Sequence, residues 1–212
     1  MENMTRRDFG KLALGASAGL MTLTVTGCNW VKDVEEWAVD GQASIASLVA
    51  TLQANGVTVP SGQGTPLFDL NAALTSVEQA ASTYLSTSPA PQGALQKIED
   101  ALADCSTAVS NFLTALGLPG GGLLALVTTL GEFLLSTIAG FVNKASAASG
   151  TSVAATSFRV GAQSYTVTPV YRSPRAYKSG WNGVLDKSSG VTIPKGAKFR
   201  LSVRERLHLT RE

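Results

Sequence analysis

The sequence is poor in the side chains on which most metal and cofactor sites depend. It holds one histidine and two cysteines in 212 residues, and only 15% of its residues are charged. Residues 29–149 contain no histidine and one cysteine, so this part of the chain has no Glu-x-x-His sequence for a di-iron site and lacks the ligand sets of zinc and haem sites. No D-x-D-x-D-G loop for calcium is present. These absences predict a protein that carries no metal ion and no cofactor.

The chain also lacks the short motifs of the common enzyme classes. From residue 28 onward it contains no S-x-x-K sequence, no P-loop and no Rossmann fingerprint. The lone His208 lies four residues from Glu212 and has no Ser or Cys beside it in a known catalytic arrangement. We therefore predict no enzymatic activity. Inspection leaves paired-carboxylate chemistry open, because such partners need not be neighbours in sequence.

The first 28 residues have the three-part layout of an export signal, with a charged start, an apolar middle and a small-residue end. The segment Thr5–Lys11, with the sequence TRRDFGK, resembles the twin-arginine family of signals. That pattern consists of Ser or Thr, two Arg, any residue, Phe, a hydrophobic residue and often Lys, and Gly10 departs from it at the hydrophobic position. The resemblance implies export, with Arg6, Arg7 and Phe9 as the recognised residues.

The sequence VTGC, which ends at Cys28, resembles a lipobox, in which Gly precedes a cysteine that receives a diacylglycerol and becomes the new N-terminus. The resemblance implies that residues 1–27 are a cleaved signal and that Cys28 anchors the protein to a membrane of the cell envelope, at the periplasmic face or the cell surface. The alternative is an ordinary cleaved signal with Cys28 near the cleavage site. A G-x-S-x-G sequence at residues 15–19 is typical of hydrolases, but it lies in the leader and is assigned no role.

Charge divides the remainder of the chain into an acidic and a basic half. Residues 29–149 hold 3 basic and 10 acidic side chains, a net charge of −7. Residues 150–212 hold 11 basic and 3 acidic side chains, a net charge of +8. Residues 147–157 have the Ala, Ser, Thr and Gly content of a linker. We therefore expect an acidic unit over residues 28–146 and a basic unit over residues 158–212.

The acidic unit has the apolar spacing of a helical bundle. Apolar side chains recur every three or four residues from Trp30 to the region of Gly56, and again in three later segments. These segments are residues 70–84, 95–116 and 123–142. The stripe from Leu95 to Leu116 is the most regular, and it includes Cys105, which has no disulfide partner if Cys28 is lipidated and behaves there as a small hydrophobic side chain. The pattern predicts an up-down bundle of about four helices within an α+β fold.

Residues 123–142 hold a single charge and are apolar enough that a membrane span must be weighed. A polar or small stripe recurs every four residues at Thr128, Glu132, Ser136 and Gly140. A carboxylate at the middle of a membrane costs about 2.5 kcal/mol or more. We therefore expect a buried bundle helix. The alternatives are a helix that packs against a partner through its small stripe, and a membrane-inserted helix.

The basic unit is predicted to form a small antiparallel β module. Residues 158–160 and 164–171 are rich in β-branched and aromatic side chains and predict a hairpin, in which Pro169 confines the second strand to an edge or ends it early. Residues 198–209 alternate with period two, which is typical of a strand with one buried face. The opposite face carries Lys198, Arg200, Arg204, Arg206 and His208.

This cationic face is the candidate contact with an anionic partner. An exported protein meets anionic lipid, envelope polysaccharide or an acidic protein, so export disfavours nucleic acid as the partner, although basic and aromatic residues occur together here. The alternative is a solvated strand face that is neutralised in part by the acidic half of its own chain or of a neighbour.

Together these features predict an exported, lipid-anchored envelope protein with a non-enzymatic scaffold or binding role. Two alternatives belong to other classes of protein. One is a carrier that holds an apolar ligand between the helices of the bundle. The other is a subunit of an envelope assembly, in which the opposite charges of the two halves meet on neighbouring copies.

Overall fold

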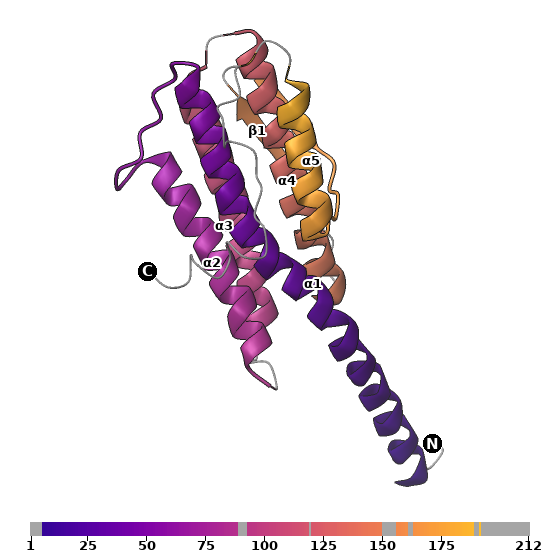
Figure 1. The fold of residues 1–212 in the computed structure, drawn as a ribbon. Helices are drawn as coiled ribbons and strands as arrows, with labels where there is room; N and C mark the ends of the chain where they lie inside the picture. The colour runs from indigo at the N-terminus through magenta and orange to yellow at the C-terminus, as the bar shows by residue number, and fades with distance from the viewer. Residues whose placement is uncertain are drawn as a thin grey trace.

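The computed structural model of the chain describes residues 6–88, 93–118, 120–149, 156–160, 163–188 and 191, with side-chain environments from Asn29 onward. The described residues form five helices and one hairpin. In chain order these are α1 (Arg6–Ala54), α2 (Pro66–Ser86), α3 (Ala94–Ala115), α4 (Gly122–Ser149), β1 (Thr156–Val160), β2 (Gln163–Val167) and α5 (Pro174–Lys187). Figure 1 shows α1 to α4 side by side, with the chain direction alternating from one helix to the next. The predicted helical bundle is confirmed.

The apolar stripes of the sequence are the core of this bundle. Helix α3 buries every third or fourth residue along its length, and Ile98, Leu102 and Val109 are fully inaccessible to solvent. Helix α2 buries its own stripe in the same cluster. Helix α2 begins where the sequence favours it, because Thr65 accepts a hydrogen bond from the Phe68 backbone N–H at 3.4 Å and proline occupies the first helical position.

Helix α4 is long and apolar enough to cross a membrane by length and composition, but 56% of its most apolar stretch is buried inside the molecule. Its apolar side chains, among them Val127, Leu134 and Phe141, lie in the common core. The polar and small stripe of α4 is also partly covered. The Val170 backbone N–H donates to the Ser136 carbonyl at 2.8 Å, so residues 168–173, which we name the strap, run along this stripe. This packing agrees with the expectation from the sequence that residues 123–142 form a buried helix of the bundle.

The structure differs from the predicted β module of residues 158–212. The described residues contain one antiparallel hairpin, in which Phe158 pairs with Tyr165. Residues 174–187 form helix α5 instead of β structure, so the prediction of a β-rich segment there is wrong. Ser173 caps this helix by accepting from the Ala176 backbone N–H at 3.4 Å, and its apolar residues recur with helical spacing. Helix α4 continues to Ser149 and β1 begins at Thr156, so both elements extend into the range of residues 147–157 predicted as a linker.

The hairpin and α5 share the core of the bundle. Val160 and Val167 from the two strands, and Tyr177, Trp181 and Leu185 from α5, belong to the same buried cluster as α1 to α4. Figure 1 shows α5 beside α4 and close to α1. Helix α5 belongs to the basic half of the sequence and packs against α1 and α4. Its contacts therefore determine how the basic half meets the acidic half.

Gly140 marks the closest approach of the strap to α4, and it gives a direct test of that contact. A Cβ atom at Gly140 would lie 2.4 Å from the carbonyl carbon and oxygen of Val170. We expect Gly140→Ala to lower the free energy of unfolding by about 2 kcal/mol, as overpacking does. Gly183 in α5 is the matched control, because its Cβ would meet nothing within 4 Å.

Gly183→Ala is expected to raise the free energy of unfolding by up to about 1 kcal/mol through helix propensity. Urea unfolding of the two variants, followed by circular dichroism, measures both effects. Equal stabilisation by the two substitutions would show that the strap does not sit on α4.

Candidate functional site

The residues that the sequence singles out as functional fall mostly outside the described part of the chain. Lys198, Arg200, Arg204, Arg206 and His208 lie beyond residue 191 and are not described. Arg6, Arg7, Phe9 and Cys28 precede the first described side chain, that of Asn29. The structure therefore brings none of these candidates together with another. What it does bring together is a set of polar and aromatic side chains where α1, α4, α5 and the strap meet.

A buried polar stripe on α1 forms one wall of this region. Asp40, Ser44, Ser47 and Thr51 are all buried and recur every three or four residues, so they share one helical face. The hydroxyl groups are partnered within the helix. The Ser44 hydroxyl donates to the Asp40 carbonyl at 2.8 Å, and the Thr51 hydroxyl donates to the Ser47 carbonyl at 2.9 Å. This leaves the Asp40 carboxylate as the group that most needs a partner from outside the helix.

Helix α5 supplies that partner. The Lys178 Nζ atom lies 3.0 Å from the Asp40 Oδ2 atom, and the Asp40 side chain is fully buried while the Lys178 side chain is 21% exposed. One turn further along α5, the Trp181 Nε1–H group donates to the Ser47 Oγ atom at 3.1 Å. Helix α5 is therefore joined to α1 by an ion pair and a buried hydrogen bond, and not by apolar contact alone.

Aromatic side chains fill the space around these polar contacts. The Phe133 ring on α4 lies 5.4 Å from the Tyr177 ring and 6.4 Å from the Trp181 ring, and the Trp37 ring lies 6.1 Å from that of Tyr177. These separations are typical of favourable aromatic pairs. Burial raises the pKa of the Tyr177 phenol well above its ordinary value, and the neighbouring Ser44 hydroxyl opposes that shift in part. Tyr177 therefore stays neutral, as its place in the core requires.

The strap is fastened to α4 by Arg172. One nitrogen of its guanidinium, Nη1, donates to the Ser136 hydroxyl at 2.6 Å and to the Thr137 hydroxyl at 2.9 Å. The guanidinium carbon lies 4.2 Å from the centre of the Phe133 ring, a cation–π geometry. Partial burial lowers the pKa of Arg172 from its ordinary value.

Tyr171, next to Arg172, ties the strap to α1. Its hydroxyl donates to the Asp33 carboxylate, and the Lys144 ammonium lies 5.2 Å from the centre of its ring. Partial burial and the bond to Asp33 together raise the pKa of Tyr171 above its ordinary value. The strap thus contacts two helices of the bundle, which fixes the position of α5 that follows it.

Two surface grooves flank this region. The first has a volume of about 370 Å³ and lies between α4, β2 and the strap; it is lined by Thr129, Glu132, Phe133, Ser136, Thr166, Val167, Thr168, Val170 and Arg172. The second has a volume of about 340 Å³ and lies between the start of α4 and the end of α5, with Lys187 as its charged residue. Both volumes fall in the range of small-molecule sites.

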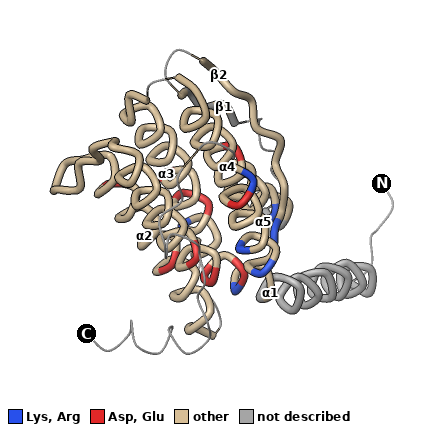
Figure 2. The backbone as a smooth tube through the Cα atoms, turned by 45° about the horizontal axis from the view of Figure 1, so that its top comes forward, with Lys and Arg blue, Asp and Glu red and all other residues tan. Residues whose placement is uncertain are grey.

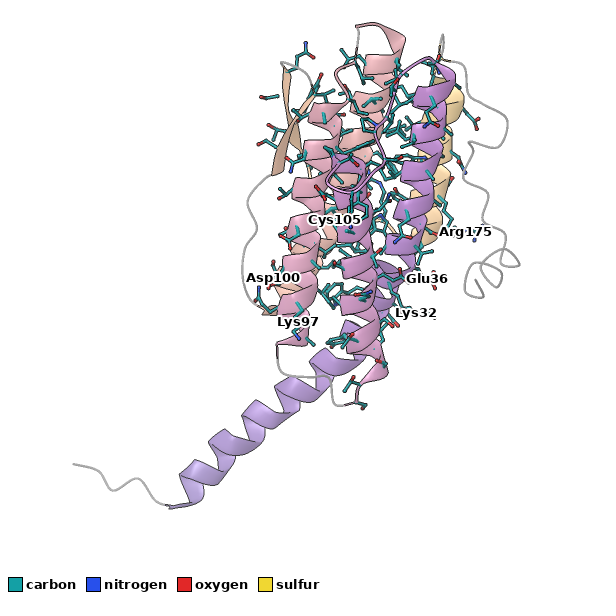
Figure 3. All side chains as sticks on the ribbon, turned by 90° about the vertical axis from the view of Figure 1, so that its left-hand side faces the viewer. Lys32, Glu36, Lys97, Asp100, Cys105 and Arg175 are labelled. Atoms are coloured by element: carbon teal, nitrogen blue, oxygen red, sulfur yellow. The ribbon has the colours of Figure 1, made fainter. Side chains whose placement is uncertain are left out.

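Charge is distributed unevenly along the bundle. Between Asp40 and Asp69, and again between Asp104 and Glu132, the sequence contains no charged residue. Figure 2 shows the consequence, with coloured segments gathered toward one end of the bundle and the loops at the other end drawn in tan. Figure 3 shows Lys32 and Lys97 at the end where the described side chains of α1 begin. The loops of the acidic half at the far end of the bundle are therefore uncharged, whereas Lys187 at the end of α5 lies near the start of α4.

Cys105 is buried in the middle of the bundle, as Figure 3 shows, and it forms no disulfide within the described residues. The structure confirms its prediction as a core residue. Burial raises the pKa of its thiol to about 12, and the nearby Asp104 carboxylate adds to the shift. Because only the thiolate is nucleophilic, we expect Cys105 not to react with a thiol reagent at neutral pH until the protein unfolds.

The same pKa shift predicts a pH dependence of stability. The unfolded thiol ionises around its ordinary pKa of 9.0, well below the folded value of about 12. Between pH 9 and pH 12 the unfolded chain therefore binds fewer protons than the folded protein. The contribution of Cys105 to the free energy of unfolding is complete below pH 9 and decreases as the pH rises toward 12. The difference in urea midpoint between the native protein and Cys105→Ala, measured at pH 8 and pH 10.5, isolates this contribution. An identical difference at both pH values would contradict it.

The described residues therefore define a helical bundle with a docked hairpin and a fifth helix, and they hold no group of three or more His, Cys, Asp or Glu placed to bind a metal ion. No protein-family model matches the chain, and no curated protein and no solved structure is significantly similar to it. Sequence reasoning missed the Asp40–Lys178 pair. The signal that marks it is a charged residue at the start of a helical stripe whose other members, Ser44, Ser47 and Thr51, are small and uncharged.

Proposed function

We propose that the protein is an exported, lipid-anchored protein of the cell envelope with a non-enzymatic scaffold or binding role. Arg6, Arg7 and Phe9 direct export through the twin-arginine route, and Cys28 carries the lipid. The bundle is a compact body held at the membrane. Residues 198–208 of the basic half contact an anionic partner, and their period-two alternation supports a further strand of an antiparallel β module in that segment.

The observation that carries the proposal is the short distance along the chain between the lipobox-like sequence and the first described core residues. Asn29 is exposed, Trp30 is 8% exposed and Val31 is fully buried. Cleavage before Cys28 leaves all of these residues in the mature protein. A lipid on Cys28 lies about 3 Å along the helix axis from Trp30, at a rise of about 1.5 Å per residue. The anchor therefore holds the bundle directly at the membrane surface, with no tether between them.

Export and lipidation are tested by expressing the full chain in a bacterium that has a twin-arginine pathway. We expect the mature protein to begin at Cys28, to incorporate labelled palmitate and to fractionate with membranes. Cys28→Ser is expected to abolish the label, whereas Cys105→Ser, the matched control, is expected to retain it. Arg6→Lys combined with Arg7→Lys is expected to leave the precursor in the cytoplasm.

Two results overturn this part of the proposal. One is labelling that survives in Cys28→Ser. The other is export that is unchanged in the double lysine variant, since two lysines preserve the positive charge and remove only the arginine pair.

The anionic partner is tested separately in a chain that carries Cys28→Ser and therefore lacks the lipid. We expect this chain to bind envelope fractions at low salt and to lose that binding when Arg200, Arg204 and Arg206 are changed together to Ser, because exposed charge contacts are lost with the charges and weaken as salt rises. The control is Lys32→Ser, which removes a cation from the acidic half. Binding that persists in the triple variant overturns the assignment of this segment.

A further inference from the structure

The groove between α4 and β2 contains an arginine whose position is fixed but whose hydrogen bonding is incomplete among the residues that the structure describes. The three acceptors recorded for Arg172, which are the Ser136 and Thr137 hydroxyls and the Val170 carbonyl at 3.5 Å, all bind Nη1. Within the described part of the chain, no acceptor is recorded for Nε or Nη2. These two nitrogens form the side-on fork that binds a carboxylate with two parallel hydrogen bonds.

The same groove contains a carboxylate. Glu132 lies one helical turn before Ser136 on α4, which separates the two residues by about 6 Å along the helix axis. Both Glu132 and Arg172 line the groove. Among the residues that the structure describes, no ion pair joins them. The groove is therefore lined by a carboxylate that can bind a cation and a guanidinium that can bind an anion. Among the described residues, these two groups do not neutralise each other.

Hydroxyl groups complete the lining. Thr129 comes from α4, and Thr166 and Thr168 come from β2 and the residue that follows it. Phe133 also lines the groove, and the Arg172 guanidinium lies 4.2 Å from the centre of its ring. A site of about 370 Å³ with these side chains suits a small polar ligand with a short apolar part.

We infer that this groove binds a free amino acid as a zwitterion, with the ligand carboxylate on Nε and Nη2 of Arg172 and the ligand ammonium on Glu132. Each charged group alone would attract a simple ion. Together they discriminate against simple ions. The Glu132 carboxylate repels an anion that has no ammonium group, and the Arg172 guanidinium repels a cation that has no carboxylate. The inference depends neither on residues 198–208 nor on export.

The inference is tested by titrating the purified full chain with each standard amino acid in a calorimeter. Acetate, methylamine and inorganic phosphate are titrated in parallel, since each lacks one of the two charges. We expect saturable binding in the millimolar range for at least one amino acid. We expect at least about tenfold weaker binding of the three simple ions, because each leaves one charged group of the site without a partner.

Glu132→Gln is the main variant, because the Glu132 side chain forms no ion pair or hydrogen bond with another described residue and its loss leaves the Arg172 anchor intact. We expect it to weaken amino-acid binding at least about tenfold. Arg172→Lys keeps the charge but removes the fork, and a similar loss is expected. Lys187→Gln changes the charge of the other groove and serves as the matched control, with unchanged binding.

Three outcomes overturn the inference. No saturable binding of any amino acid shows that the groove is not such a site. Binding that is unchanged in Glu132→Gln places the ligand elsewhere. Acetate or phosphate binding as tight as that of the best amino acid shows a simple anion site, in which Glu132 has no part.

Discussion

Replacement of Trp181 by Ala is expected to lower the free energy of unfolding by about 3 to 5 kcal/mol, the usual range for a fully buried tryptophan. Trp181 is completely buried between α1 and α4, where its ring contacts Phe133 and its Nε1–H group donates to Ser47. The alanine variant leaves a cavity, and the Ser47 hydroxyl loses the donor from Trp181 while it still donates to the Ser44 carbonyl at 2.7 Å. Urea unfolding followed by circular dichroism measures the loss.

Trp181→Phe separates the two contributions. It preserves most of the apolar volume but cannot donate to Ser47, so its cost should include about 1 kcal/mol for the missing hydrogen bond. Adding Ser47→Ala to Trp181→Phe should then cost less than Ser47→Ala costs in the native chain, because the two groups interact. A loss of less than about 1 kcal/mol in Trp181→Ala would mean that α5 does not pack against the bundle as described.

Lys178→Ala is expected to lower the free energy of unfolding by about 3 kcal/mol, the low end of the range for breaking a buried ion pair. The Asp40 carboxylate is completely buried, and the substitution removes the ammonium group that lies 3.0 Å from it. We choose the low end because the Lys178 side chain is 21% exposed, so water compensates in part for the lost partner.

The matched control for this prediction is Lys187→Ala. Lys187 lies in the last turn of the same helix and is exposed, so its replacement should change stability by less than about 0.5 kcal/mol. Adding Asp40→Asn to Lys178→Ala should restore part of the lost stability, because a neutral amide costs less to bury than a carboxylate that has lost its ammonium partner. Equal stability of the two lysine variants would show that the ion pair does not hold α5 in place.

These two predictions concern the same structural question, which is how the basic half of the sequence is attached to the acidic half. The overall charges of −7 and +8 suggest attraction between two separate units. The structure shows a more specific attachment, in which one lysine reaches one buried aspartate and Arg172 binds two hydroxyl groups on α4. Net charge predicts that the halves attract each other, but it does not predict which side chains meet.

The helices of the acidic half were predictable because their signals are local. The apolar stripe from Leu95 to Leu116 has the period of an α-helix, and Thr65 followed by proline is a helix start. The hairpin was predictable for the same reason, since β-branched residues on both sides of Gly161 and Ala162 favour two short strands. Helix α5 is not predicted from the sequence, because residues 158–212 are interpreted as one β module in which basic and aromatic residues occur together. Tyr177 and Trp181 are in fact buried core residues with helical spacing.

The sequence by itself determined the bundle helices, the position of the hairpin and the burial of Cys105, because backbone geometry imposes a period on any segment that buries one face. The tertiary structure alone decided that Lys178 meets Asp40, that the strap covers the small stripe of α4, and that Glu132 and Arg172 line one groove. Ser47 and Trp181, which share a hydrogen bond, are 134 residues apart in the chain. Contacts of that kind depend on how complete helices pack together, and no local pattern in either segment encodes them.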